Sequence, residues 1–348
     1  TITAAKDAAI AGVDASIEAA VGAGNAVAGS SYVLTTSVDN LTGTAGDDPF
    51  TADNTGTVNT ASAADSINGG NGNDTLSIFS DGTVDDSPSL TSIETVAIYD
   101  KDDAFNISAQ SIQNLNIIRG EGDETFTVGA GTAVSVSNVA IGTGTDNASL
   151  TIAYAATDTS ASLSLTGVTD FNNDTNEDVT VTGAALTSID VTATGTASNF
   201  DALSVAAATT VNLNAAVAFT APIETTGTAG TLTITGAGVA TIGSIDTGFT
   251  TVNASASTGG LSATDAAAAT VITGSDTAAD SINVGVVAKT GAISLGASAG
   301  DRIEFTDDTN YTATAAQVSG AEILRVAGAG SAYNVTQIDG IEAIEVQT

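Results

Sequence analysis

From Ser31 onward, short runs of Val, Ile, Leu, Thr and Ser alternate with corners that are rich in Gly, Asn and Asp. Within several runs, apolar and polar residues alternate one by one, as in Leu232-Thr-Ile234. This alternation predicts short β-strands with one buried and one exposed face. We expect strands at Tyr32–Thr36, Thr75–Phe79, Thr95–Tyr99, Leu115–Ile118, Thr125–Val128, Leu150–Ala153, Leu163–Leu165, Val179–Thr182, Ile189–Thr192, Val211–Leu213, Leu232–Thr235, Ile303–Phe305, Ile323–Val326 and Ile344–Val346.

The first thirty residues follow another pattern. In this Ala-rich stretch, Ile10, Val13, Ile17 and Val21 recur at helical spacing, and glycines follow. Residues 1–30 are therefore expected to form a short N-terminal helical segment.

A loose repeat runs through the rest of the chain. Its clearest copy is Leu90-Thr-Ser-Ile93-Glu94-Thr-Val96, and similar copies begin at Ile112, Leu186 and Ile338. If Leu115 is the equivalent of Ile93, the period is 22 residues (115 − 93). A period near 20 residues suits one turn of a parallel β-solenoid, or β-helix. The alternative is a tandem β-sandwich, which the 3 Pro and the 4% aromatic content make less favourable.

This pattern divides the chain into a helical segment at 1–30, a β region at 31–150 and a repetitive Ala/Thr-rich solenoid region at 151–348. The 348 residues are 42% apolar and 13% charged, so a folded chain is expected rather than a disordered one. Because Met is absent, we expect Thr1 not to be a translation start, and the chain to be a processed product or a fragment.

Composition excludes much chemistry. The chain has no Cys, His, Met or Trp, so it cannot form disulfides or a nucleophile activated by His. The net charge is −34, from 40 acidic and 6 basic residues. Nucleic acid is therefore excluded as a partner, because phosphate binding needs clustered Lys and Arg. No apolar run approaches the length of a membrane span, so membrane insertion is not expected. Divalent cations would relieve the repulsion, and oxygen ligands suit Ca²⁺.

One motif carries specific chemistry. Residues 69–77, GGNGNDTLS, match the calcium-binding nonapeptide G-G-x-G-x-D-x-U-x at every fixed position. The glycines permit positive φ in a tight turn, the Asp supplies a carboxylate, and the Leu points into the core. The candidate calcium residues here are Asp65, Gly70, Asn71, Gly72, Asn73 and Asp74.

A related turn precedes this motif. Residues 41–50, LTGTAGDDPF, place Asp47 and Asp48 at the acidic positions. The stretches SYVLTTSVDNLTGTAGDDPFTA, AADSINGGNGNDTLSI and LTSIETVAI together resemble the calcium-binding repeat-in-toxin (RTX) proteins, and most closely their Ala/Thr-rich surface-layer and surface-filament members. The resemblance covers about residues 31–118. Beyond them it is limited to the general residue composition and the loose repeat.

The resemblance implies a bacterial surface protein that leaves the cell by type I secretion, folds on Ca²⁺ outside it, and assembles with copies of itself into a lattice or filament. It gives Asp48 and Asp74 the carboxylate roles and gives the residues from Gly70 to Asn73 the turn positions, which offer mostly backbone oxygens. RTX toxins carry tandem nonapeptides, whereas this chain has one good copy, so scattered single calcium sites are expected.

Weaker acidic corners add further candidates. Several acids lie in corners a few residues before an apolar residue: Asp123, Asp146, Asp276, Asp280 and Asp301. Oxygen-bearing side chains also alternate at Asp170, Asn172, Asp174 and Asn176, as in the first half of an EF-hand loop, but the Gly and Glu of that loop are missing. The alternative for every corner is an ordinary turn in which the side chain bonds nearby backbone.

These observations favour a structural protein over an enzyme, because few aromatic residues and six scattered basic residues are available to build a substrate cleft. The competing interpretation is a calcium-stabilised adhesin or glycan-binding module, for which cell-surface polysaccharide is the expected partner. Thr pairs such as Thr192-Ala-Thr194 could line a flat binding face, although they do not recur at a fixed period in the sequence.

Overall fold

The chain folds into a parallel β-solenoid, as the computed structural model shows. The structure describes residues 27–55, 57, 59–80, 87–99, 105–118, 124–141, 149–170, 178–205, 207–265, 270–284, 291–305, 318–327 and 338–347. Every strand pair in these ranges is parallel, which confirms the predicted solenoid and excludes the β-sandwich. The described residues contain no helix; most of the expected N-terminal helix, at residues 1–26, lies outside them, and residues 27–30 have no regular structure.

One sheet extends along the whole column. We call this 14-stranded sheet the long sheet. It continues across residue 150, because β11 pairs with β14. Its strands are β1 (Tyr32–Val33), β3 (Pro49–Asn54), β5 (Thr75–Ser80), β7 (Thr95–Tyr99), β9 (Asn114–Ile118), β11 (Ala133–Ser137), β14 (Ser160–Thr166), β17 (Ser188–Ala193), β20 (Thr210–Ala215), β23 (Gly230–Gly236), β25 (Phe249–Ser257), β27 (Val271–Thr273), β29 (Ile293–Ser294) and β31 (Val318–Ser319).

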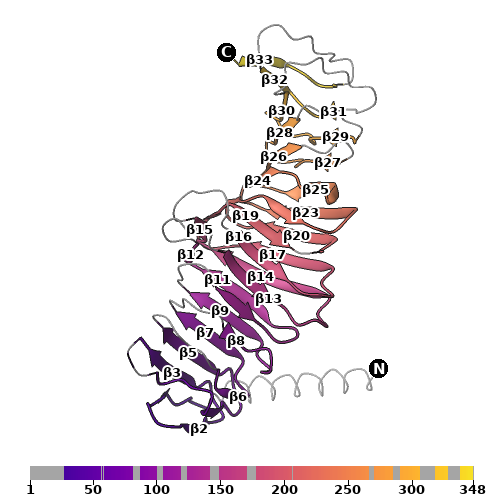
Figure 1. Ribbon diagram of the computed structural model, residues 1–348. Coiled ribbons are helices and arrows are strands. Elements are labelled where there is room, and N and C mark those ends of the chain that lie inside the picture. Colours follow the sequence, from indigo (N-terminus) through magenta and orange to yellow (C-terminus); the bar gives the residue numbers. More distant parts are fainter. Residues whose placement is uncertain are drawn as a thin grey trace, which may run out of the picture.

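Three further sheets form the other sides of the column (Figure 1). The N-terminal sheet contains β2 (Asn40–Thr42), β4 (Ser66–Asn68) and β6 (Ser89–Thr91). The middle sheet contains β8 (Phe105–Asn106), β10 (Thr125–Thr127), β13 (Ser149–Ala153), β16 (Asp178–Thr182), β19 (Ala202–Val205) and β22 (Ile223–Thr225). The C-terminal sheet contains β12 (Ala140–Ile141), β15 (Thr169–Asp170), β18 (Ser198–Asn199), β21 (Phe219–Thr220), β24 (Ala240–Ser244), β26 (Leu261–Asp265), β28 (Ser281–Val284), β30 (Arg302–Phe305), β32 (Ile323–Ala327) and β33 (Ala343–Gln347).

The turns differ both in length and in the number of sheets that they visit. Near the N-terminus a turn alternates between two sheets, and Thr95 pairs with Asn114, 19 residues later (114 − 95). In the middle of the column a turn visits the long, C-terminal and middle sheets in succession, and Val134 pairs with Leu163, 29 residues later (163 − 134). Beyond β22, turns visit the long and C-terminal sheets alone.

The core is a single stack of apolar side chains inside the column. In β20, the side chains of Val211, Leu213 and Ala215 point inward and are buried, whereas the alternating Thr and Asn side chains point outward. Several phenylalanines are buried in this core, and the rings of Phe200 and Phe219 meet edge to face with centroids 5.8 Å apart. The alternation predicted from the sequence therefore gives the correct inward face.

The loose repeat is only partly structural. Leu90, Ile93, Leu186 and Ile189 are all buried, as expected for inward positions. The alignment of Leu115 with Ile93 is wrong, however, because Leu115 pairs with Val96.

Two copies of the repeat also place their acids differently. Glu94 directly precedes β7, whereas Asp190 lies within β17 and is exposed. The sequence pattern is the same in both copies, but the strand begins at a different position within it.

All fourteen expected strands are confirmed as parts of longer or shorter strands, with β1 reduced to two residues. The prediction missed several strands, including β3, β11 and β25. The first of these begins at Pro49, directly after two Asp residues, and this sequence is typical of a turn.

Replacing Leu213 by Ala should destabilise the column, because it leaves a cavity between two covered levels of the core. We expect a loss of about 2–5 kcal/mol in the free energy of unfolding. The control Asn212→Ala, one residue away on the outer face, should change it by less than about 1 kcal/mol. Denaturant unfolding followed by circular dichroism measures both; equal effects would contradict the inward assignment of Leu213.

Candidate functional site

Acidic residues that directly precede a strand connect successive turns of the column. Asp48 precedes β3, Asp74 precedes β5 and Glu94 precedes β7. The Asp74 Oδ1 atom accepts the backbone N–H of Asp48 at 2.8 Å, and Glu94 Oε2 accepts that of Asp74 at 2.8 Å. Each carboxylate thus caps the equivalent residue of the preceding turn. We call Asp48, Asp74 and Glu94 the N-terminal carboxylate ladder.

The same arrangement occurs again near the other end of the column. Asp280 precedes β28, Asp301 precedes β30 and Glu322 precedes β32. Asp301 Oδ1 accepts the N–H of Asp280 at 2.7 Å, and Glu322 Oε2 accepts that of Asp301 at 2.9 Å. We call these three residues the C-terminal carboxylate ladder. It lies at the entry to the C-terminal sheet, whereas the N-terminal ladder lies at the entry to the long sheet.

The second oxygen of several carboxylates closes the local corner. Asp48 Oδ2 accepts the N–H of Thr44 at 2.5 Å, and Asp280 Oδ2 accepts that of Ser275 at 2.7 Å. Asp65 behaves similarly: its Oδ1 atom accepts the N–H of Asp39, one turn earlier, and its Oδ2 atom accepts that of Ser62. These Asp side chains therefore satisfy backbone donors both within a turn and between turns.

Two ladder oxygens are left without a hydrogen bond. The Oδ2 atoms of Asp74 and Asp301 are buried and have no hydrogen-bond partner. Both residues are 0% exposed, so bulk water does not reach these atoms. Burial raises the pKa of the Asp74 carboxyl, and the nearby negative charge of Glu94 raises it further. Burial also raises the pKa of Asp301. Each free oxygen would be satisfied by a proton or by a cation.

Neighbouring acids of the C-terminal ladder affect one another's pKa. Burial raises the pKa of Asp280 to about 6, and the negative charge of Asp301 also raises it. The hydrogen bonds that Asp280 accepts from the N–H groups of Leu261 and Ser275 lower it. Asp48 differs, because hydrogen bonds from Ser30 and Thr44 outweigh the effect of burial and lower its pKa.

Glycines bring the turns of the RTX-like region close together. Gly70 and Gly72 have φ of 99° and 126°, which confirms that the nonapeptide turn uses positive φ. A Cβ atom on Gly69 would collide with both the Ser92 carbonyl oxygen and Asp74 Oδ2. These two oxygens therefore border the same small niche beside Gly69. The corresponding niche beside Gly43 is bordered by the Gly69 carbonyl oxygen and Asp48 Oδ2.

Carbonyl and carboxylate oxygens are the donors that Ca²⁺ takes, so the donor types in these niches fit that ion. Of the residues in the niche beside Gly69, Asp74 and the Ser92 carbonyl would hold it. In the described part of the chain, however, no three acidic side chains converge as a metal-binding group. The acids are stacked one per turn instead.

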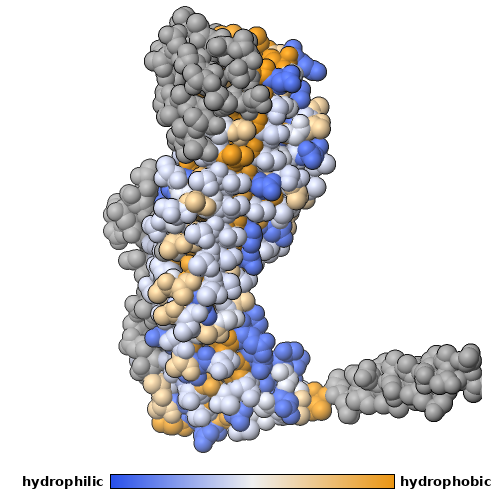
Figure 2. Space-filling view, turned by 90° about the vertical axis from the view of Figure 1, so that its right-hand side faces the viewer, coloured by the Kyte–Doolittle hydropathy of each residue, from blue (hydrophilic) through white to orange (hydrophobic). Residues whose placement is uncertain are grey.

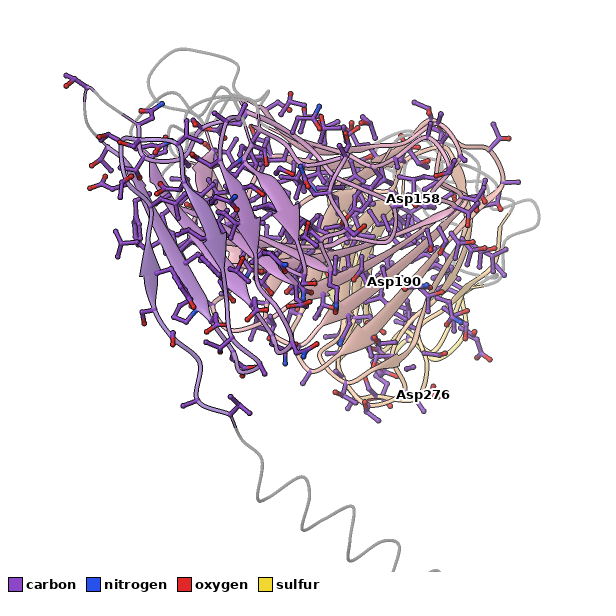
Figure 3. The ribbon with its side chains drawn as sticks, turned by 90° about the horizontal axis from the view of Figure 1, so that it is seen from below. Asp158, Asp190 and Asp276 are labelled. Atoms are coloured by element: carbon purple, nitrogen blue, oxygen red, sulfur yellow. The ribbon has the colours of Figure 1, made fainter. Side chains whose placement is uncertain are left out.

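The other predicted site residues are dispersed. Asp47 Oδ1 accepts the N–H of Asn73 at 2.8 Å, and the N–H of Asn71 donates to the Thr44 carbonyl at 3.3 Å. Asp276 is exposed after β27, and Figure 3 shows it on a different part of the coil from Asp190 and Asp158. Asp170 ends β15. The remaining predicted residues lie outside the described ranges: Asp123, Asp146, Asn172, Asp174 and Asn176.

The prediction did not assign a role to Glu94 or Glu322, although Glu94 lies in the clearest copy of the repeat. It also missed the threonines that take the corner position in the middle of the column. Thr187 Oγ1 donates to the Thr159 carbonyl at 3.2 Å, and Thr209 Oγ1 donates to that of Thr187 at 3.3 Å. The signal that could have found these residues is their place directly before a strand.

No protein-family model matches the chain, and no curated protein matches its sequence. The RTX resemblance therefore depends on the motif residues alone. The described part of the chain also has no helix long and apolar enough to cross a membrane.

Acidification should stabilise the calcium-free chain through Asp280. The folded chain binds this proton more tightly than the unfolded chain does, because the folded pKa is about 6 against an ordinary 3.8. The stabilisation is complete below pH 3.8 and is lost as the pH rises through about 6. For this group alone the free energy of unfolding should fall by roughly 3 kcal/mol over that interval.

The contribution of Asp280 is measured by unfolding the wild type and Asp280→Asn in EGTA, from pH 4 to pH 7. The variant should show a flatter pH dependence, because it lacks the titrating group. Identical slopes for the two proteins would contradict the assignment.

Proposed function

We propose that this chain is a structural, self-assembling extracellular protein, a subunit of a surface layer or surface filament, whose folding and assembly depend on calcium. The observation that carries the calcium part is the pair of buried carboxylate oxygens without a hydrogen bond, Asp74 Oδ2 and Asp301 Oδ2. A bound cation would satisfy such an oxygen at neutral pH and would offset the charge of −34.

The shape of the described chain supports a structural role. A column whose turns all stack on one continuous sheet is well suited to an elongated building unit. A groove of about 660 Å³ lies beside β9, but its lining is uncharged and includes Ser108, Gln110, Gln113 and Asn114. Such a lining offers no titratable group for acid–base catalysis at this groove.

The proposed location is the bacterial cell surface, after type I secretion. This part of the proposal depends on the RTX-like stretches at residues 31–118 and on the absence of Cys, which suits a chain that folds without disulfides. The proposed partners are copies of the same chain and cell-surface polysaccharide, with no nucleic acid and no membrane insertion.

One observation favours the second candidate, a glycan-binding adhesin. Phe79 and Tyr99 stack on the outer face of the long sheet, with ring centroids 4.5 Å apart and planes 16° from parallel. Phe79 is 39% exposed, and Asn116 lies on the same face two turns away along the sheet. A flat aromatic pair beside amide groups could accept a sugar ring. The same pair is also an ordinary cross-strand contact.

Calcium should order and assemble the chain. In EGTA at neutral pH we expect a strand signal by circular dichroism that is lower than in calcium, and little light scattering. At about millimolar Ca²⁺ both should rise, because the cation satisfies the buried carboxylates and reduces self-repulsion. Mg²⁺ at equal ionic strength is the control for charge screening. A chain that responds equally to both ions, or to neither, would contradict the calcium part of the proposal.

Asp74→Ala should raise the calcium concentration at the midpoint of ordering by at least about tenfold. The matched control is Asp246→Ala, because the Asp246 carboxylate caps the N–H of Gly248 within its own corner at 2.8 Å. Its midpoint should stay within about twofold of that of the wild type. Equal shifts in the two variants would argue that calcium acts on the net charge and not at the Asp74 niche.

A further inference from the structure

The outer face of the long sheet carries an ordered array of neutral polar side chains. Thr210, Thr231 and Thr251 align across three successive strands. The Thr pairs do not recur at a fixed period in the sequence, but turns of unequal length bring single Thr residues into register on the sheet. A neighbouring row of aligned residues on the same face contains Asp190, Asn212, Thr233, Asn253, Thr273 and Ser294. We call the outward side chains of the seven long-sheet strands from β14 to β29 the hydroxyl face; these strands are β14, β17, β20, β23, β25, β27 and β29.

This face is almost free of charge on a strongly acidic protein. Among the 14 strands of the long sheet, only Asp53 and Asp190 are ionisable acids, and the strands contain no Lys or Arg. The Asp190 carboxylate accepts a hydrogen bond from Asn212 Nδ2 at 2.7 Å within the array. On the long side of the column shown in Figure 2, residues of intermediate hydropathy predominate and strongly hydrophilic ones are scattered.

The middle and C-terminal sheets are more charged than the long sheet. The C-terminal sheet presents Glu304, Arg325 and Glu345, which form ion pairs at 3.4 and 3.1 Å. The middle sheet presents the exposed Glu224. Two copies that approach through these sides or through the acidic corners bring like charges together, whereas contact through the hydroxyl face does not.

We propose that the hydroxyl face is the surface through which two copies of this chain associate. The inference rests on the proposed self-assembly and names the surface that mediates it. With neighbouring strands about 4.8 Å apart, the seven strands of this face extend over roughly 30 Å. A strip about five residues wide then offers roughly 500 Å² per copy, or about 1,000 Å² for two copies together, which is the lower size limit of a specific interface.

A single negative charge at the centre of this face tests the inference. Thr233 is a half-buried outward residue of β23, flanked by Asn212 and Asn253. Thr233→Asp should raise the concentration needed for assembly in calcium at least about tenfold, because like charges meet in a desolvated contact. The matched control is Thr151→Asp, at an equally half-buried outward position of β13 in the middle sheet. It adds the same charge and should shift assembly less than about threefold.

Sedimentation velocity over a range of concentrations measures the assembly of all three proteins, and circular dichroism verifies that each is folded. If the wild type assembles and Thr233→Asp assembles equally well, the hydroxyl face is not the contact and self-assembly stands. Equal weakening by both variants indicates a general charge effect and overturns the inference. A wild type that stays monomeric in calcium contradicts both proposals. If that monomer binds insoluble cellulose and Thr233→Asp does not, the face binds glycan instead.

Discussion

The hydrogen bond from a backbone N–H to a carboxylate one turn away is the interaction on which the ends of this column depend. Parallel strands satisfy one another's backbone groups, but the residue at each corner lies outside the strands. At the corners before β3 and β5, and again before β28 and β30, the corner N–H finds its acceptor in an Asp or Glu of the following turn. In the middle of the column the corners are linked differently: threonine hydroxyls donate to the backbone carbonyl of the preceding corner, and they do so without charge.

This use of carboxylates has an electrostatic cost. Burial at the corners raises the pKa of Asp74, Asp280 and Asp301. The negative charge of the next acid along the ladder raises each pKa further. A chain with a net charge of −34 has few basic groups to compensate. The proposed calcium therefore has a physical reason that is independent of the RTX resemblance: it would satisfy oxygens that the protein leaves free. The charge-poor outer face of the long sheet is the complementary feature, because it offers one side on which copies can meet.

Much of this fold follows from the sequence, because the alternation of apolar and polar residues fixes which side chains enter the core. Leu76 is buried, as the nonapeptide predicts, and Val211 and Leu213 in an expected strand are buried too. The nonapeptide likewise predicts positive φ at Gly70 and Gly72. The register between turns could not be predicted, because residues paired across successive turns are 18 (50 − 32) to 30 (199 − 169) residues apart and the corner sequences are degenerate. The hydrogen-bond partner of Glu94 could not be predicted either, since it is the backbone N–H of Asp74. Nearly every residue type has a backbone N–H, so the sequence does not show which one donates.

The most direct test is hydrogen exchange at the backbone amide of Asp48, followed by NMR or by mass spectrometry with residue resolution. The account predicts slow exchange in the calcium-bound wild type, because Asp74 Oδ1 accepts this N–H in the interior. In Asp74→Ala the exchange at Asp48 should accelerate at least about tenfold, while amides of the C-terminal ladder keep their protection. An Asp48 amide that exchanges like an exposed loop in the wild type, or at an unchanged rate in the variant, would contradict the ladder as the bond between turns.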